Sequence, residues 1–213
     1  MRDILGPIYL ITDGSATAGG DIAGAVEKAL RGGVRSVQLR EKVLDAKRLL
    51  RLARELRALT NRYGARLIIN DRADVALLSG ADGVHLGQKG IAPVDARKML
   101  GEKMLIGVST HSVDEAVRAR DGGADFITVG PVYHTPSKAT YGAPIGAGMI
   151  REARAVVDIP AYAIGGIDKD NLKETVENGA DGVAVISAIL GSEDVEKSAR
   201  EMIAAFRLTK EPI

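Results

Sequence analysis

The chain has 213 residues, enough for one domain with a large core and a little short for two. Its 29 basic and 28 acidic residues are interspersed and leave a net charge of +1, so no basic stripe indicates a nucleic-acid partner. The lack of cysteine excludes disulfides and thiolate metal sites, and 3% aromatic residues are too few for a base-stacking platform.

Eight short apolar runs alternate with helical patterns along the whole chain. We expect strands over residues 8–13, 36–40, 66–70, 83–86, 105–109, 126–130, 160–164 and 182–187. Several of these runs are apolar on both faces, which is typical of parallel strands covered by helices.

The clearest helical pattern covers residues 45–63, where Asp45 can cap the start and Gly64 the end. Ser112 and Glu115 have the spacing of a capping box at the start of another helix. The other helices are expected over residues 21–31, 72–79, 93–100, 112–121, 147–157, 169–178 and 194–207.

Strands that alternate with helices predict a parallel sheet with right-handed crossovers. Eight such units in this length fit a compact (β/α)8 TIM barrel, with residues 1–213 as a single domain. Four glycine signatures recur before alternate strands and are interpreted as helix C-caps on the stability face of the barrel: Gly32-Gly33, Gly80-Ala81-Asp82, Gly123-Ala124-Asp125 and Gly179-Ala180-Asp181. The main alternative is an open doubly wound sheet, but the turn after Asp13 lacks the GxGxxG spacing of a dinucleotide site.

No apolar stretch approaches the ~18 residues of a membrane span. The start of the chain, MRDILGPIYLITDG, has no long apolar segment before a cleavage site. We therefore expect a soluble cytoplasmic protein with no membrane partner.

Glycines and a serine end the last two predicted strands, at Gly165-Gly166 and at Ile186-Ser187. Barrels often bind phosphate with the loops after strands 7 and 8 and the N-terminus of a short helix. Because both halves of such a site occur together, we favour phosphate binding over a tight turn without a ligand.

The second predicted strand and the residues just after it contain Gln38, Arg40 and Lys42 at alternate positions. Alternate residues of a strand share one face, so all three can point into the barrel mouth. Two cations and an amide on one face suit a polyanion such as a diphosphate. The alternative is an exposed strand end, which an inward-facing arginine disfavours.

Asn70 and Asp71 end the third strand. A carboxylate with substrate phosphates is a typical Mg²⁺ ligand set, whereas an Asp before residues 72–79 is also a common helix N-cap. The pair alone leaves both interpretations open, and the neighbouring polyanion site favours the metal.

The longest predicted loop covers residues 131–146 and contains Thr135, Ser137 and Lys138, a second candidate anion cluster. Ser109 ends the fifth strand, where it can hydrogen-bond a leaving phosphate or a ring.

The histidines show no zinc-site spacing, and no catalytic triad or carboxylate pair stands out. His85 is expected to be packed or hydrogen-bonded within a strand, and His111 lies near a helix start. His134, in the long loop, is the candidate proton shuttle.

The motifs YLITD, VQLREK, LIINDRADVAL, ADGVHLGQ, IGVSTHS, GPVYHTPSK, AIGGI and GVAVIS run in order over residues 9–187. This ordered set resembles the thiamine-phosphate synthase family. The resemblance implies a (β/α)8 barrel and a transferase that joins the small molecules 4-amino-2-methyl-5-hydroxymethylpyrimidine diphosphate and thiazole phosphate, releasing diphosphate. Members of the family commonly form small homo-oligomers, although no motif here identifies an interface.

The resemblance also implies roles for individual residues. The pyrimidine diphosphate would be held by Gln38, Leu39, Arg40, Glu41, Lys42, Asn70, Ser109 and Lys138, with Mg²⁺ on Asp71. The thiazole phosphate would be held by Thr135, Pro136, Ser137, Gly166, Ile186 and Ser187. The expected catalytic residues are Arg40, Lys42, Ser109 and Lys138.

Two positions depart from the family pattern. Gly90 stands where a second Mg²⁺ carboxylate is often found, and Ser137 replaces a threonine. One alternative is a thiazole tautomerase of the same superfamily, whose catalytic histidine would stand at Pro131. The other is a non-catalytic phosphate-ligand sensor. The intact set of Gln38, Arg40 and Lys42 and the Asn70-Asp71 pair favour the synthase over the tautomerase. A sensor would not need a Mg²⁺ site and two separate anion clusters.

Overall fold

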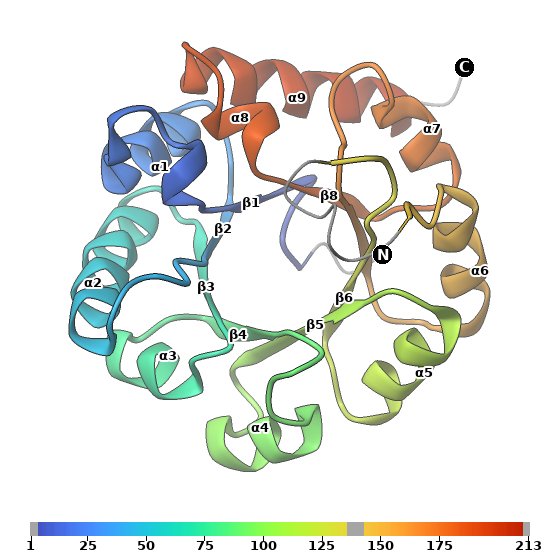
Figure 1. The fold of residues 1–213 in the computed structure, drawn as a ribbon, viewed down its shortest axis with the longest axis horizontal. Helices are drawn as coiled ribbons and strands as arrows, with labels where there is room; N and C mark the ends of the chain where they lie inside the picture. The colour runs from blue at the N-terminus through green and yellow to red at the C-terminus, as the bar shows by residue number, and fades with distance from the viewer. Residues whose placement is uncertain (1–3, 136–142, 211–213) are drawn as a thin grey trace.

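The computed structural model describes residues 4–135 and 143–210. Its eight parallel strands close into a barrel in chain order, and β1 (Ile8–Ile11) pairs with β8 (Gly182–Val185) to complete it. Seen down the barrel, the helices form a ring outside the strands (Figure 1). The predicted (β/α)8 architecture is confirmed.

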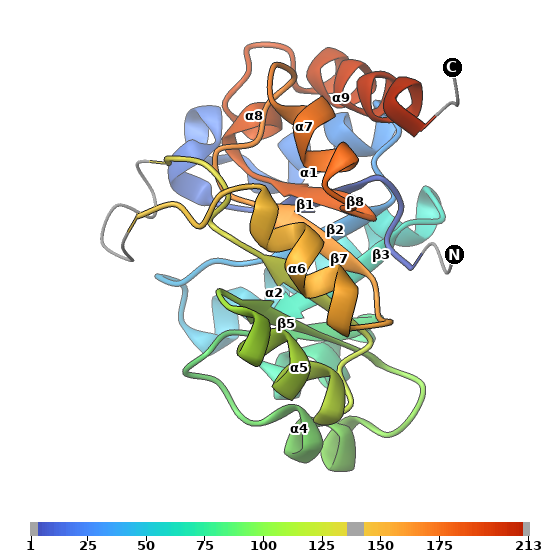
Figure 2. The same ribbon diagram turned by 90° about the vertical axis from the view of Figure 1, so that its right-hand side faces the viewer.

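The remaining elements follow one another as the alternation predicts. They are the 3₁₀ helices η1 (Gly14–Ala16) and η2 (Ala18–Gly20), the strands β2 (Ser36–Leu39), β3 (Arg66–Asn70), β4 (Gly83–Leu86), β5 (Leu105–Thr110), β6 (Phe126–Val129) and β7 (Ala161–Ile164), and the helices α1 (Ile22–Arg31), α2 (Ala46–Arg62), α3 (Ala73–Ser79), α4 (Pro93–Leu100), α5 (Val113–Asp121), α6 (Gly148–Val156), α7 (Leu172–Glu177), α8 (Ser187–Leu190) and α9 (Val195–Lys210). In the side view of Figure 2, the described segments on either side of residues 136–142 project from one end of the barrel.

The main corrections concern strand ends. β8 stops at Val185, so Ser187 is the first residue of the short helix α8 rather than the last of a strand. β1 stops at Ile11, and Asp13 instead accepts a 3.0 Å hydrogen bond from the backbone N–H of Ser15 at the start of η1. Both predicted strands were too long because they included the polar residues Asp13 and Ser187, which begin or precede the next helix instead of extending the strand.

The predicted helix caps are confirmed. The Asp45 carboxylate accepts from the backbone N–H of Arg48 at 2.8 Å, and Ser112 accepts from that of Glu115 at 3.2 Å. In a capping box the Glu115 carboxylate would accept from the backbone N–H of Ser112. Here it accepts instead from that of His111, one residue earlier, at 2.6 Å.

Alternate side chains of the strands divide the core into two parts. The outward set packs under the helices and includes Leu39, which is 1% exposed. The inward set fills the barrel, with the rings of Tyr9, Phe126 and Tyr162 in edge contact at centroid distances of 5.7 to 6.2 Å. On β5, a Cβ at Gly107 would lie 2.2 Å from the Phe126 ring, so this position must lack a side chain for the interior to close.

The N-terminal ends of the strands carry a repeated ion pair. Asp82, Asp125 and Asp181 precede β4, β6 and β8, and each carboxylate accepts from a backbone N–H within the first two residues of the preceding strand at 2.7 to 2.9 Å. Each also pairs with an arginine, namely Arg57, Arg97 and Arg154. The glycines two residues before these aspartates have positive φ, as the C-cap interpretation predicted.

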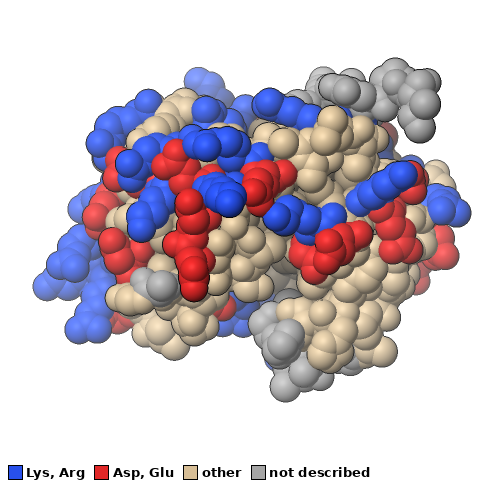
Figure 3. Space-filling model, turned by 90° about the horizontal axis from the view of Figure 1, so that it is seen from above, with Lys and Arg blue, Asp and Glu red and all other residues tan. Residues whose placement is uncertain are grey.

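Charges of both signs alternate on the surface that carries α8 and α9 (Figure 3). Arg200 and Lys169 pair there with Glu196 and Glu201 at 2.7 and 2.6 Å. No helix within residues 4–135 and 143–210 is long and apolar enough to cross a membrane.

Candidate active site

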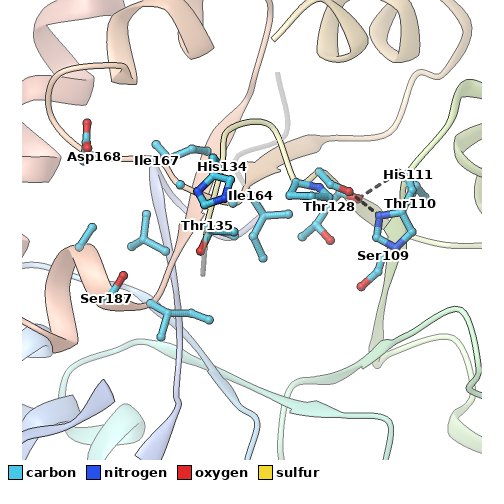
Figure 4. Close-up of a pocket in the computed structure, with 18 residues that line it drawn as sticks. Ser109, Thr110, His111, Thr128, His134, Thr135, Ile164, Ile167, Asp168 and Ser187 are labelled. Carbon is cyan, nitrogen blue, oxygen red and sulfur yellow. Dashed lines mark hydrogen bonds between the residues drawn. The ribbon is translucent and has the colours of Figure 1, made fainter. Parts of the chain in front are cut away.

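A cavity of about 370 Å³ opens at the carboxyl ends of β5 to β8. Five of the predicted substrate-binding residues line it: Ser109, Thr135, Gly166, Ile186 and Ser187. Ser187 lies across the cavity from Ser109 (Figure 4). These residues come from four different strand ends, so the barrel brings together positions that are up to 78 residues apart in the sequence.

One wall of the cavity offers backbone N–H groups. Within the described chain, the N–H groups of Gly166 and Ser187 donate to no protein acceptor. Ser187 begins α8, whose first N–H groups have no intrahelical partner. Gly166 has φ of +65°, and its lack of a side chain lets the loop after β6 approach closely, since a Cβ would lie 2.5 Å from the His134 carbonyl oxygen. This wall can receive an anion.

The segment 130–135, which follows β6, is held against β7 and α7. The backbone N–H groups of Val132 and Tyr133 donate to the carbonyls of Ile164 and Gly165 at 2.9 and 3.0 Å. The Tyr133 hydroxyl donates to the Glu174 carboxylate at 2.8 Å. Burial, together with the neighbouring Glu174 carboxylate, raises the pKa of Tyr133 above its ordinary value.

The residues of the QLREK motif do not all share one face. Gln38 is buried inside the barrel, where its amide donates to the Tyr9 hydroxyl at 2.9 Å, and Leu39 points outward into the helix layer. Arg40 is half-buried just beyond β2. Lys42 is exposed in a turn, so the strand alternation that predicted its direction does not extend to it.

Glu41 has a carboxylate that is already occupied. It accepts from the Thr12 hydroxyl at 2.6 Å and from the backbone N–H of Gly14 at 3.1 Å. Thr12 in turn accepts from the backbone N–H of Arg40 at 3.0 Å. Glu41 therefore fixes the turn that presents Arg40, a role that the sequence did not indicate.

Asp71 has a left-handed backbone with φ of +56°, a conformation that non-glycine residues rarely adopt. Its carboxylate accepts from the backbone N–H of Gly87 and from the Asn70 amide, both at 2.8 Å. The N-cap alternative is wrong, because α3 starts after Arg72 and has no side-chain cap. The Asp71 side chain is exposed, and a Cβ at Gly90 would lie 3.1 Å from its Oδ1.

The histidines differ in their environments. His85 is buried and hydrogen-bonded, as predicted, with Nε2 3.0 Å from the Ser109 hydroxyl. His134 is exposed and lines the cavity. His111 also lines it, with Nδ1 hydrogen-bonded to the Gly130 carbonyl, and was not predicted as a site residue (Figure 4).

Two further residues line the cavity but were not predicted from the sequence. Thr128 lines the cavity from inside β6, and strand alternation from the inward Phe126 could have found it. Asp168 also lines the cavity, but nothing in its local sequence distinguishes it from a helix cap. Pro136, Ser137 and Lys138 lie outside the described residues.

Comparison with known proteins identifies the family. Residues 8–189 match the family described as thiamine monophosphate synthase. A relative from Geobacter sulfurreducens is 53% identical over 197 residues, covering 92% of each chain. A thiamine-phosphate synthase of Clostridium novyi is 42% identical over 200 residues, covering 94% of this chain and 98% of the relative.

A solved structure agrees with the sequence comparison. The thiamine phosphate pyrophosphorylase from Pyrococcus furiosus superposes with a TM-score of 0.89 at 36% identity, covering 96% of this chain and 97% of that one. The similarity therefore extends over the barrel and the strand ends that form the cavity. This chain belongs to the thiamine monophosphate synthase family.

Proposed function

We propose that this protein is a thiamine-phosphate synthase. It joins the methylene carbon of 4-amino-2-methyl-5-hydroxymethylpyrimidine diphosphate to the nitrogen of the thiazole phosphate and releases diphosphate. The observation that carries the proposal is one cavity lined by Ser109, Thr135, Gly166 and Ser187, in a chain of this family. A site that binds two phosphorylated substrates needs separate anion positions at one barrel mouth, and the strand ends supply them.

The thiazole phosphate would bind at the wall formed by Gly166 and Ser187. Their unpaired backbone N–H groups can donate to phosphate oxygens, and the start of α8 adds its positive end. Thr135 and Ile186 border the same cavity, where they would contact the rest of the thiazole substrate. Pro136 and Ser137 are assigned to this half by family resemblance.

The pyrimidine diphosphate would occupy the half formed by β2, β3 and β5. Arg40 is the half-buried cation presented by the Glu41 turn, and Lys42 adds a second, exposed charge. Asn70 and Ser109 would contact the substrate, and Lys138 is assigned by resemblance. Gln38, Leu39 and Glu41 shape this half, since their side chains are committed inside the protein.

Asp71 fits a Mg²⁺ site of the kind that uses one carboxylate together with substrate phosphates. Its side chain is exposed, at a strained position beside the diphosphate half. Residues 4–135 and 143–210 contain no group of three or more acidic, histidine or cysteine ligands, so most other ligands would come from diphosphate and water. When bound, Mg²⁺ would neutralise part of the charge on the departing diphosphate.

The reaction needs charge stabilisation and positioning more than a general base. The carbon–oxygen bond to diphosphate breaks, and both bonding electrons leave with the diphosphate. Arg40 and Lys42 would stabilise that negative charge, while the amino-pyrimidine ring stabilises the methylene cation. The thiazole nitrogen, held at the Gly166 and Ser187 wall, then uses its lone pair to form the new carbon–nitrogen bond.

Two alternatives are weaker. A thiazole tautomerase would need its catalytic histidine at Pro131, and it has no diphosphate to hold. A non-catalytic sensor would not need separate anion positions. The named relatives favour the synthase over both.

The test is turnover of both substrates with and without Mg²⁺, measuring thiamine phosphate and released diphosphate. Asp71→Asn tolerates the left-handed backbone, and we expect it to lower the Mg²⁺-dependent rate by at least about tenfold. Asp74→Asn, which removes an exposed carboxylate paired with Arg72 at 2.8 Å, is the matched control. Isomerisation of the thiazole phosphate alone would instead identify a tautomerase, and binding without turnover a sensor.

Three features stay predictions of the sequence. They are the single domain over residues 1–213, the cytoplasmic location and the homo-oligomer. Size-exclusion chromatography with light scattering would measure the oligomeric state.

A further inference from the structure

A chain of buried polar side chains crosses the barrel beneath the cavity. The Gln38 amide donates to the Tyr9 hydroxyl at 2.9 Å, and that hydroxyl lies 3.5 Å from His85 Nδ1. On the other side of the ring, His85 Nε2 lies 3.0 Å from the Ser109 hydroxyl and 3.4 Å from that of Thr128. The mechanism above gives no role to Tyr9, His85 or Thr128, which are all buried.

The chain has a defined direction. The Tyr9 hydroxyl accepts a hydrogen bond from the Gln38 amide, so its own proton is donated to a different group. Among the described residues, His85 Nδ1 is the acceptor that faces this hydroxyl. If Nδ1 carried a proton, the fully buried Tyr9 hydroxyl would donate to nothing. This arrangement favours the tautomer of His85 with its proton on Nε2, which faces the Ser109 hydroxyl.

A hydroxyl that accepts from His85 keeps its own proton for another partner. Ser109 is half-buried and lines the cavity, so this proton is available to a bound molecule. The direction also excludes Ser109 as a nucleophile activated by His85, because Nε2 has no free lone pair to receive the proton of the serine.

We propose that Gln38, Tyr9 and His85 are positioning residues that make the Ser109 hydroxyl a hydrogen-bond donor to the substrate. The atom that Ser109 meets is then an acceptor of the pyrimidine diphosphate, either a diphosphate oxygen or a ring nitrogen. This assignment rests on the proposed function, and it gives Gln38 a role as a support for Tyr9 through its Nε2.

Histidine ring ¹⁵N spectra test the direction without any turnover. His85 is expected as the Nε2–H tautomer, whereas His111 is the opposite Nδ1–H tautomer because its Nδ1 faces the Gly130 carbonyl, which can only accept. His111→Asn and His134→Asn variants assign the signals. In Tyr9→Phe, the Nε2–H preference of His85 should weaken. An Nδ1–H tautomer at His85 in the unaltered protein overturns the proposal.

A double-mutant cycle tests whether Tyr9 acts through Ser109. Tyr9→Phe should lower kcat/KM for the pyrimidine diphosphate about threefold to tenfold, the range of one neutral hydrogen bond. In a Ser109→Ala background the same change should have no further effect. Additive losses would overturn the proposal.

Tyr162→Phe is the matched control for these measurements. Tyr162 is a second buried tyrosine in contact with the Tyr9 ring, but its hydroxyl accepts from the backbone N–H of Leu5 at the other end of the barrel. Tyr162→Phe should leave the His85 tautomer and kcat/KM unchanged. If Tyr162→Phe lost as much activity as Tyr9→Phe, Tyr9 would have only a packing role, and the proposal would be overturned.

Inorganic diphosphate distinguishes the two acceptors. If Ser109 donates to a diphosphate oxygen, Ser109→Ala weakens inhibition by diphosphate, and if it donates to the ring, inhibition is unchanged. If the protein made no thiamine phosphate, the proposed function would be wrong. The tautomer measurement would still decide the direction of the hydrogen bonds from Gln38 to Ser109.

Discussion

Gly90 and Asp71 share one corner of the barrel mouth, since a Cβ at Gly90 would lie 3.1 Å from Oδ1 of Asp71. The backbone N–H of Gly90 donates to the Gly87 carbonyl at 2.9 Å, and the N–H of Gly87 donates to Asp71. The turn after β4 is therefore built around the Asp71 carboxylate. Gly90 has no positive φ, so another residue can occupy it after a small shift.

We predict that Gly90→Asp strengthens the response to Mg²⁺. A second carboxylate beside Asp71 raises the negative charge of the ligand set, which should lower the Mg²⁺ concentration for half-maximal activity on the order of tenfold. Gly90→Asn has nearly the same shape without the charge and is the control. An equal response in the two variants would show that position 90 does not reach the metal.

Gly166→Ala should disrupt the thiazole half of the cavity. The new methyl group would lie 2.5 Å from the His134 carbonyl oxygen at a φ of +65°, so the loop after β6 must move. We expect a raised KM for the thiazole phosphate and a loss of more than about 1 kcal/mol of stability. Gly80→Ala is the matched control, with φ of +67° and open space around it. If the two variants had similar KM values for the thiazole phosphate, the contact with the loop after β6 could not be the cause of the raised KM.

The Tyr133 hydroxyl predicts a stability change at high pH. Because its pKa in the folded protein is raised by burial and by Glu174, its contribution is fully present below pH 10 and is lost as the pH rises through the folded-state pKa. Tyrosinate absorbance that is present in the unaltered protein and missing from Tyr133→Phe should titrate above pH 10. Titration of that signal at or below pH 10 would contradict the anchoring contact with Glu174.

The ion pair beneath β6 should stabilise the fold without affecting the reaction. The Asp125 carboxylate accepts at 2.7 Å from both Arg97 and the backbone N–H of Ile106, so Asp125→Asn should cost about 1–3 kcal/mol in urea unfolding. Asp95→Asn removes an exposed partner of Lys98 and should cost under about 1 kcal/mol. A change in KM for either variant would contradict the separation of stability and activity.

The barrel could be predicted because each strand and helix carries its own periodic pattern. Strand ends were less predictable, since the polar residues Lys42 and Ser187 continue the alternation after pairing has stopped. The N-cap interpretation of Asp71 was wrong because α3 starts after Arg72, a helix boundary that the residue pattern did not specify. The hydrogen-bond chain from Gln38 to Ser109 could not be predicted, because its residues come from four strands and local sequence does not specify contacts between strands.

The three Arg–Asp pairs at the N-terminal ends of the strands have a consequence for how such a protein can change over generations. Asp82, Asp125 and Asp181 fix the register of three strand pairs from the end of the barrel that holds no substrate. Residues at the opposite end take no part in these three ion pairs. Residues around the substrates can therefore change while the backbone still superposes on a relative at 36% identity with a TM-score of 0.89.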